Sequence, residues 1–225
     1  MQKTKAKDYF IQNAIMLYDS REKENNEILR AFQSVGIKYE RKIGNGVAFN
    51  FGDYSFYIDG KDYRTDIIFE RKGSLNELFS NINDNNEDTI RHKNDDMRNN
   101  LEREFERMNI FQVREKWLMV EGVNNFSEIK NFKLDVKKQI PNENDSDYKE
   151  KMRKYNYFKA LSQTAGIQIY STLLSWQCSN RHNFKMFCSK SQYDIGVEMV
   201  TICYYFWRNE MKLKGLIEGT YYIGG

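Results

Sequence analysis

The chain has 225 residues, of which 40% are hydrophobic and 30% are charged, so it can bury one sizeable core and is neither disordered nor fibrous. The net charge is only +3, which permits nucleic-acid binding through a local patch but does not argue for it. Three cysteines without a CxxC pair argue against a disulfide framework and against a zinc site. The composition therefore leaves function to local motifs.

Neither a membrane span nor a signal peptide is expected. The longest uncharged stretch, residues 160–180, is interrupted throughout by Ser, Thr and Gln, which makes it too polar for a bilayer. The charged N-terminus is followed by no apolar run of signal-peptide length. The chain is accordingly expected to be cytoplasmic and to have no membrane partner.

In the first half of the chain, apolar strands alternate with amphipathic helices. The expected elements are, in order, a strand at 15–18, a helix at 28–35, a hairpin arm at 47–58, its return strand at 65–72 and a helix at 74–82. Gly36 is a natural C-cap for the first helix, and Gly52 interrupts the hairpin arm with a bulge or kink. Ser74 and Glu77 have the S-x-x-E spacing of a capping box, which opens the second helix.

The second half of the chain continues the alternation around a polar stretch. Beyond an Asn-rich loop at 81–100, the expected elements are a helix at 101–108, a strand at 117–120, a helix at 169–178, a strand at 184–188 and a helix at 192–211. Residues 130–159 carry nine Lys or Arg against five acids and are expected to be a basic insertion. The pattern indicates one α/β domain over 1–225, with a core at about 12–211 and a short tail at 212–225. In it a central mixed sheet is flanked by helices on both faces.

Asp53 and the run Glu70-Arg71-Lys72 are the residues best suited to chemistry. Side chains of a strand alternate faces, so Glu70 and Lys72 project to one side and Arg71 to the other. A hairpin can bring Asp53 beside Glu70, giving Mg²⁺ two carboxylate ligands for phosphodiester hydrolysis, with a lysine near the attacking water. The bare spacing favours a salt-bridged surface strand. Against that reading, the run follows the apolar residues 67–69, at a strand end where α/β domains place ligands.

The residues around these positions extend the pattern. Gly52-Asp53-Tyr54 precedes the hairpin, and Phe69-Glu-Arg-Lys72 and Ser74-Leu-Asn-Glu-Leu78 follow it. Together they resemble the GDY…ERKxxxD signature of the XPF-type structure-specific nuclease family. Residues 18–22 resemble the family's opening strand, which ends in D-x-R-E, and residues 118–122 resemble its L-V-E-G strand. Short matches to phage and bacterial members lie at 173–177, 187–188 and 204–205.

This resemblance implies a restriction-endonuclease-like core of the PD-(D/E)xK type. It implies a DNA endonuclease of repair or recombination that uses Mg²⁺ or Mn²⁺ to hydrolyse phosphodiester bonds in branched, flapped or junction DNA. By position, Asp53 and Glu70 become metal ligands, and Lys72 positions or activates the water. Arg71 falls on the family's arginine, which binds phosphate or braces the site.

Four further positions are supporting candidates. The resemblance makes Asp19 an additional acid at the metal, with Arg21 nearby, although the two also fit a surface ion pair after a strand. The family's final aspartate falls on Asn76, which can hydrogen-bond a metal-bound water but supplies no charge. Glu77 substitutes for it if the helix start shifts by one residue, whereas the capping box explains Glu77 equally well. A catalytically silent module that binds DNA or protein on the same fold is therefore the alternative function.

DNA contacts are expected from basic residues outside the signature. The candidates are Arg91, Lys93 and Arg98 in the loop after the signature helix, and Lys151, Arg153 and Lys154 in the insertion. Aromatic residues interleave with the basic ones in the insertion, which suits a nucleic-acid strand. The alternatives are a solvated mixed-charge surface at the loop and a lid without a partner at the insertion.

Two expectations concern surfaces. The helix at 192–211 has more apolar residues than core packing needs, and members of the family commonly dimerise through this domain, so a homodimer contact is expected there. His92 and His182 are far apart in polar contexts and are expected at the surface rather than as a general base or metal pair.

Overall fold

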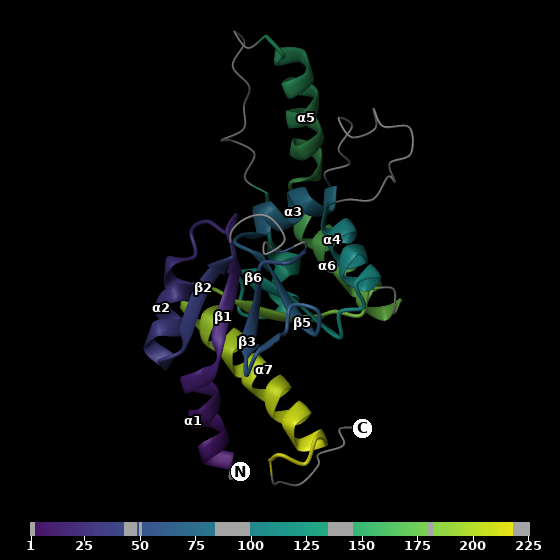
Figure 1. Cartoon of the computed structure of the whole chain (residues 1–225). Helices are drawn as coiled ribbons and strands as arrows, with labels where there is room; N and C mark the ends of the chain where they lie inside the picture. The colour runs from purple at the N-terminus through teal and green to yellow at the C-terminus, as the bar shows by residue number, and fades with distance from the viewer. Residues whose placement is uncertain are drawn as a thin grey trace.

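The computed structural model describes residues 3–42, 49, 51–83, 100–134, 146–179 and 182–217. The strands are β1 (Ile15–Asp19), β2 (Lys38–Lys42), β3 (Tyr54–Ile58), β4 (Lys61–Asp62), β5 (Ile67–Lys72), β6 (Glu115–Glu121) and β7 (Lys185–Ser189). The helices are α1 (Lys3–Asn13), α2 (Asn26–Val35), α3 (Leu75–Asn83), α4 (Asn100–Ile110), α5 (Tyr148–Leu161), α6 (Ala165–Cys178) and α7 (Gln192–Leu213), with a 3-10 helix η2 (Phe126–Asn131). Figure 1 shows the helices arranged around a central sheet.

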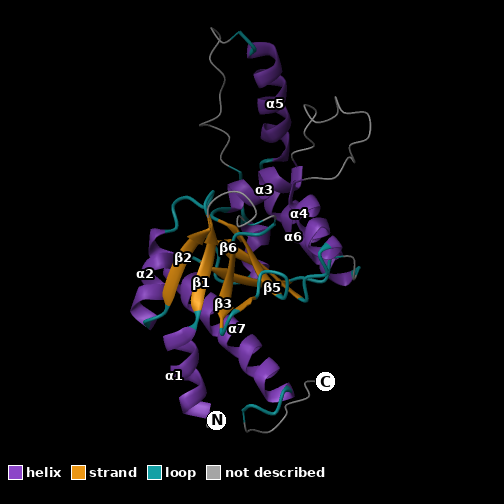
Figure 2. Ribbon diagram, in the orientation of Figure 1, coloured by secondary structure: helices purple, strands orange, loops and turns teal. Residues whose placement is uncertain are grey.

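The seven strands form one mixed sheet, as the sequence predicts (Figure 2). Its order is β2-β1-β3-β5-β6-β7, with β4 paired to β3. Strand β3 runs antiparallel to both β1 and β5, whereas β5, β6 and β7 run parallel to one another. The C-terminal ends of β1, β5 and β6 and the N-terminal end of β3 therefore meet at one edge of the sheet.

Each face of the sheet is covered by its own helices. One hydrophobic cluster joins the sheet to α1, α2 and α7, and we call this side the α7 face. The other joins it to α3, α4 and α6, and we call this side the α4 face. Because side chains alternate along β5, Phe69 enters the first cluster and Ile68 the second. By the same alternation, Arg71 points to the α7 face, and Glu70 and Lys72 point to the α4 face.

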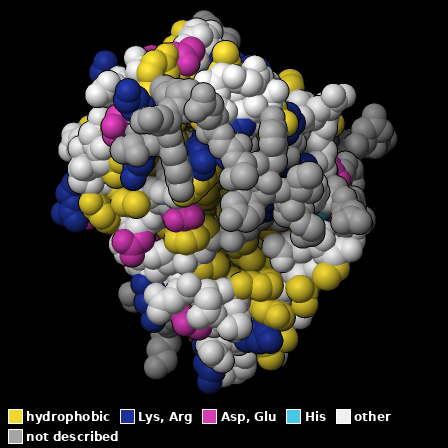
Figure 3. All heavy atoms as spheres, turned by 90° about the horizontal axis from the view of Figure 1, so that it is seen from below, with side chains coloured by type: hydrophobic (Ala, Val, Ile, Leu, Met, Phe, Trp, Pro, Cys, Tyr) yellow, Lys and Arg dark blue, Asp and Glu magenta, His cyan; other side chains and the backbone are white. Residues whose placement is uncertain are grey.

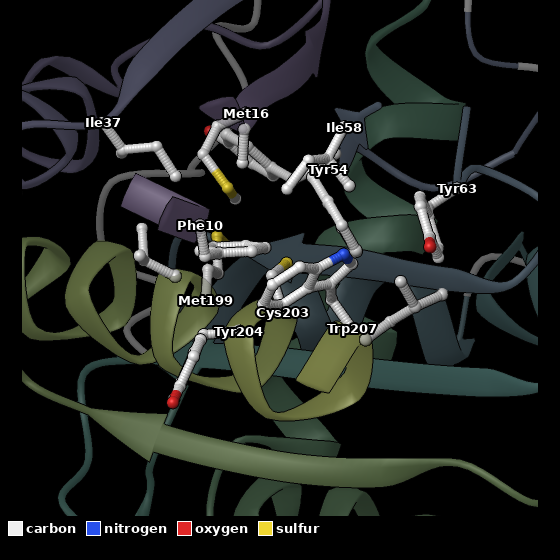
Figure 4. Packing of buried hydrophobic residues seen from close by; sticks show 14 of the residues in the cluster. Phe10, Met16, Ile37, Tyr54, Ile58, Tyr63, Met199, Cys203, Tyr204 and Trp207 are labelled. Carbon is white, nitrogen blue, oxygen red and sulfur yellow. The ribbon is translucent and has the colours of Figure 1, made fainter. Parts of the chain in front are cut away.

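The core of the α7 face contains a helix that the hydrophobic pattern did not indicate. Phe10 of α1 lies against Trp207 of α7, with ring centroids 5.5 Å apart, and the two rings pack with Tyr54 beneath the sheet (Figure 4). Among the residues from 5 to 14, whose burial the structure describes, Ala6, Phe10 and Ala14 are fully buried, a stripe too sparse to stand out among lysines.

Most other expected elements are present with shifted ends. Gly36 caps α2 with φ 82°, as predicted. The expected insertion at 130–159 contains a helix, α5, and part of it, like most of the Asn-rich loop, lies outside the described residues. Across the described ranges, no helix combines the length and apolarity that crossing a membrane requires.

Candidate active site

Backbone hydrogen bonds bring three acidic positions side by side at one edge of the sheet. The N–H of Asp19 donates to the carbonyl of Asp53 at 2.8 Å, and the N–H of Asp53 donates to the carbonyl of Phe69 at 2.7 Å. Asp53 therefore continues β3 between the end of β1 and the end of β5. Asp19, Asp53 and Glu70 occupy three neighbouring strands at the level where β1 and β5 finish.

Gly52 makes this arrangement possible. Its φ of +64° lies in the left-handed region, and a Cβ atom there would stand 2.4 Å from Cγ1 of Ile68. Only glycine avoids both the conformational strain and the clash with β5. The kink predicted at Gly52 is therefore confirmed, and its role is to let Asp53 approach β5.

The predicted trio of Asp53, Glu70 and Lys72 comes together on the α4 face. Lys72 donates from Nζ to Oε1 of Glu70 at 2.7 Å, and both side chains are more than nine-tenths buried. The backbone N–H of Arg71 donates to Oδ2 of Asp53 at 2.7 Å, which fixes that carboxylate beside the strand. Burial opposes the charge on Lys72, but Glu70 and Asp53 outweigh it and raise the pKa of Lys72.

The site holds more negative charge than its cations balance. Burial raises the pKa of Asp53 well above its usual range, and repulsion from Glu70 and Glu22 raises it further. The N–H of Arg71 and the charge of Lys72 act in the opposite direction without cancelling these effects. Two carboxylates held together in this way are suited to a divalent cation.

Asp19 lies beside the trio, but its carboxylate is engaged by Arg21. The Nε of Arg21 donates to Oδ1 at 2.9 Å, and Nη2 donates to Oδ2 at 3.0 Å. Burial works against ionisation, yet these hydrogen bonds keep the pKa of Asp19 below its usual value. The Arg21 side chain is 72% exposed, so a ligand at this edge can reach it. Direct metal ligation by Asp19 stays a prediction.

Arg71 belongs to a different network, on the α7 face. Its Nε donates to Glu121 at 2.6 Å, and its Nη1 donates to Glu22 at 2.9 Å. The hydroxyl of Tyr54 also donates to Glu22, and the side-chain amide of Gln192 on α7 donates to Glu121. These contacts support the bracing role that the resemblance allowed for Arg71. A role in binding phosphate stays a prediction.

The structure shows how Glu77 and Asn76 are used at the start of α3. The predicted capping box is present: the N–H of Glu77 donates to Oγ of Ser74 at 3.1 Å. The Glu77 carboxylate accepts from the N–H of Gly73 at 2.9 Å. Its other oxygen lies 3.7 Å from Nζ of Lys72, so the cap also borders the site. Asn76 is exposed on the first turn.

One acidic residue near the site was missed by sequence reasoning. Glu104 of α4 is half-buried, and its charge interacts with Glu70, Lys72 and Arg21; burial and Glu70 raise its pKa. The available signal was its helical spacing, three residues after Leu101 and four before Met108, which places it at the border of the buried stripe of α4. A helix with many charged residues is usually interpreted as a solvated surface, and Glu104 was therefore not among the predicted site residues.

The remaining candidates lie elsewhere. Arg91, Lys93, Arg98 and His92 fall outside the described residues, as do the side-chain atoms of Lys154. Lys151 and Arg153 are exposed on α5, where Lys151 forms an ion pair with Asp147 at 3.0 Å. The surface position expected for His182 is wrong, because the ring is fully buried beside Phe105 and Trp176.

The donor set fits a magnesium ion that keeps most of its water. Among the described residues, no group of three or more His, Cys, Asp or Glu side chains is arranged to enclose a metal. Mg²⁺, however, is usually held by one or two carboxylates together with waters and substrate phosphates. Asp53 and Glu70 supply that number of carboxylates, so the residues present suit Mg²⁺ or Mn²⁺ better than a structural zinc ion.

Comparison with known proteins adds a fold-level likeness. No protein-family model matches the chain, and no curated protein matches it. Among solved structures the chain is similar to "XPF from Aeropyrum pernix", with a TM-score of 0.48 and 12% identity, covering 89% of this chain and 69% of that one. A likeness this distant does not transfer activity or substrate, so function must be argued from the geometry of the site.

Proposed function

We propose that the chain is a metal-dependent DNA endonuclease that hydrolyses phosphodiester bonds, related to the XPF-type nucleases and acting in the cytoplasm. The observation that carries the proposal is the convergence of Asp53, Glu70 and Lys72 at the edge where β1 and β5 end, in the order that the signature requires. Branched, flapped or junction DNA is the proposed substrate, because the signature resembles that of structure-specific nucleases.

In this proposal each residue of the trio has a separate task. Asp53 and Glu70 hold Mg²⁺ or Mn²⁺, and when bound the ion polarises the phosphoryl oxygen and acidifies a water. The N–H of Arg71 keeps the Asp53 carboxylate in place. Lys72 is kept charged beside Glu70, where its ammonium can orient the attacking water or stabilise charge developing on the phosphate.

A homodimer through the C-terminal helical region is also part of the proposal. Side chains there remain exposed despite being apolar, including Tyr205 on α7 and Leu213 and Leu216 at its end. Figure 3 views the molecule from the end to which α1 and α7 extend and shows hydrophobic side chains gathered across that side. Burial of such a patch against a second copy would stabilise a dimer. Light scattering after size-exclusion chromatography tests this, with Tyr205→Lys expected to shift a dimer toward monomer.

The nuclease proposal is tested by cleavage of end-labelled flap, fork, four-way-junction and linear duplex DNA in Mg²⁺, Mn²⁺ or EDTA. We expect incision that needs a metal and is lost in Asp53→Asn. The matched control is Asp62→Asn, which removes a carboxylate from β4, beyond the far end of β3, and should leave cleavage unchanged. Absence of metal-dependent cleavage of every substrate by the wild-type chain would sink the proposal.

The rival function is a catalytically silent module that binds DNA or protein on the same fold. The observation that favours it is the exposed Asn76 where the family signature has an aspartate. Binding of the same labelled DNA without incision, in both wild type and Asp53→Asn, would support this rival.

A further inference from the structure

The helix α5 carries a net positive charge along an exposed length, with Lys151 paired to Asp147 directly before the helix. Its 14 residues include Lys149, Lys151, Arg153, Lys154 and Lys159 against the single acid Glu150. None of its described side chains is buried, and Tyr157 is 52% exposed. In Figure 1 the helix extends away from the body of the molecule, beyond α3. Leu161 at the end of the helix packs against the core of the α4 face, and a helix that places so few side chains against the core contributes little to it.

The base of α5 is held firmly although its length is exposed. The N–H of Leu134 donates to the carbonyl of Ser162, directly after the helix, at 3.1 Å. In the next helix, a Cβ atom at Gly166 would stand 2.3 Å from the carbonyl oxygen of Ile129, so α6 and η2 are in close backbone contact. The chain directly after α5 is thus anchored against α6 and η2, and α5 extends from this anchor (Figure 1).

That support lies at the same edge of the sheet as the candidate active site. The 3-10 helix η2 follows the C-terminal end of β6, and β6 pairs in parallel with β5 so that Val120 stands beside Lys72. Helix α6 packs against α3, which begins three residues after Lys72, and both helices cover the α4 face. The anchor of α5 and the pair Glu70 and Lys72 therefore lie at one edge of the sheet.

We propose that α5 is an arm that binds the DNA phosphate backbone on one side of the scissile phosphate; this rests on the proposed function. The occupant is a polyanion because basic side chains recur at nearly every turn of the helix, and the exposed Tyr157 among them suits a nucleic-acid strand. A helix of this length spans about 21 Å, which corresponds to roughly six phosphates of one DNA strand. The arm therefore selects substrates that continue past the cut by about that many nucleotides.

The test compares two triple variants in a Glu70→Gln background, which prevents cleavage during binding. One removes charge from the arm (Lys149→Ala, Lys151→Ala, Arg153→Ala), and alanine preserves the helix. The control removes three exposed lysines from the opposite end of the molecule (Lys5→Ala, Lys7→Ala, Lys38→Ala). Fluorescence anisotropy measures binding to forked DNA between 50 and 200 mM salt, with arms of full length and arms cut back to a few nucleotides.

The arm variant should bind long DNA about tenfold more weakly or worse, with the slope of log affinity against log salt reduced by about three. The arm variant should also lose the preference for forked DNA whose DNA arms have full length. The control variant should keep the wild-type affinity, salt dependence and length preference. Equal affinity, slope and length preference in the two triple variants would overturn the proposal. Circular dichroism checks that both variants are folded.

A second measurement leaves the charges intact. A photo-reactive phenylalanine at position 157 should crosslink to nucleotides on one side of the incision and clear of it, and crosslinks spread over both sides would contradict the arm. Cleavage by the wild-type chain is measured on the same DNA. If it cleaves while the arm variant binds normally, the arm is wrong and the nuclease stands. If it does not cleave while the arm variant loses binding, the arm is supported as a DNA-binding element and the nuclease proposal fails.

Discussion

The two faces of strand β5 treat three consecutive charged residues in opposite ways. On the α7 face, Arg71 is buried and its guanidinium is matched by Glu22 and Glu121. On the α4 face, Glu70 and Lys72 pair with each other, but Asp53 adds a second carboxylate that the lysine does not neutralise. Each face therefore sets one cation against two carboxylates, but on the α7 face the carboxylates also accept from Tyr54 and Gln192, whereas on the α4 face the charge of Glu70 acts on Asp53 and raises its pKa.

This difference indicates that the α7-face network stabilises the fold, whereas the α4-face residues are suited to binding a cation. On the α7 face the two carboxylates accept hydrogen bonds from the guanidinium and from neutral donors of the fold, so this network serves to hold the segment after β1, β5, β6 and α7 together. A buried pair of carboxylates is costly without a partner and becomes favourable when a cation arrives. The two faces are linked through one residue, because the backbone N–H of Arg71 orients Asp53 while its side chain anchors the opposite network.

Loss of Arg71 should produce the largest effect on stability. Arg71→Gln leaves Glu121 and Glu22 buried without their cation, which should lower the free energy of unfolding by about 3–5 kcal/mol. Urea denaturation measures the change. The control is Arg30→Gln, which breaks an ion pair with Glu27 in which both side chains are exposed and should cost no more than about 1 kcal/mol. Equal losses of unfolding free energy in the two variants would mean that the α7-face network does not stabilise the fold more than a surface ion pair does.

Loss of Glu70 should act mainly on cleavage. Glu70→Gln removes a proposed metal ligand and the partner of Lys72, so the cleavage rate in Mg²⁺ should fall on the order of 10²–10³-fold. Mn²⁺ binding, followed by electron paramagnetic resonance, should weaken in parallel. A variant that cleaves as fast as wild type would remove Glu70 from the site.

Glu104 tests how far the negative charge of the α4 face extends. Its carboxylate interacts with Glu70 and Lys72 from the neighbouring helix, so Glu104→Gln should raise the Mg²⁺ concentration needed for half-maximal cleavage about tenfold. Glu106→Gln, on the same helix two positions along, is the control. An unchanged metal requirement in Glu104→Gln would confine the site to the residues of the signature.

Asp53→Asn should stabilise the protein while it abolishes cleavage. Burial and like charges raise the pKa of Asp53 in the fold above its unfolded value, so ionised Asp53 opposes folding. In EDTA at pH 7 the variant should gain about 1 kcal/mol. The gain should shrink as pH falls toward the unfolded pKa, near 4, because the wild-type carboxyl is then protonated in both states. Thermal unfolding of wild type and Asp53→Asn across this pH range measures the difference in stability. A variant less stable than wild type at pH 7 would contradict the excess negative charge proposed around Asp53.

The sequence was sufficient where its signals were local. Alternation along β5 predicted that Glu70 and Lys72 share one face and Arg71 the other, the glycine at 52 predicted where the chain would kink, and the structure confirms both. The capping box of Ser74 and Glu77 is likewise confirmed.

What the sequence could not provide depends on tertiary contacts. The engagement of Asp19 by Arg21 and the approach of Glu104 to the site arise from neighbours that no periodicity encodes. Helix α1 was missed because three small or aromatic residues among lysines give a weak pattern until α7 packs on them. Helix α5 was not predicted because its sequence is polar, and an exposed helix lacks the apolar stripe from which helices are predicted.

Asn76 offers the smallest and most discriminating change on the α4 face. Asn76→Asp restores the carboxylate of the family signature on the first turn of α3, where an acid also interacts favourably with the helix dipole. We expect a gain in stability of about 0.3–1 kcal/mol whether or not a metal is present. If position 76 also faces the metal, the Mg²⁺ requirement for cleavage should fall as well, and Mn²⁺ should bind more tightly. A gain in stability with no change in metal binding would assign position 76 to the helix alone and leave Asp53 and Glu70 as the complete set of carboxylate ligands.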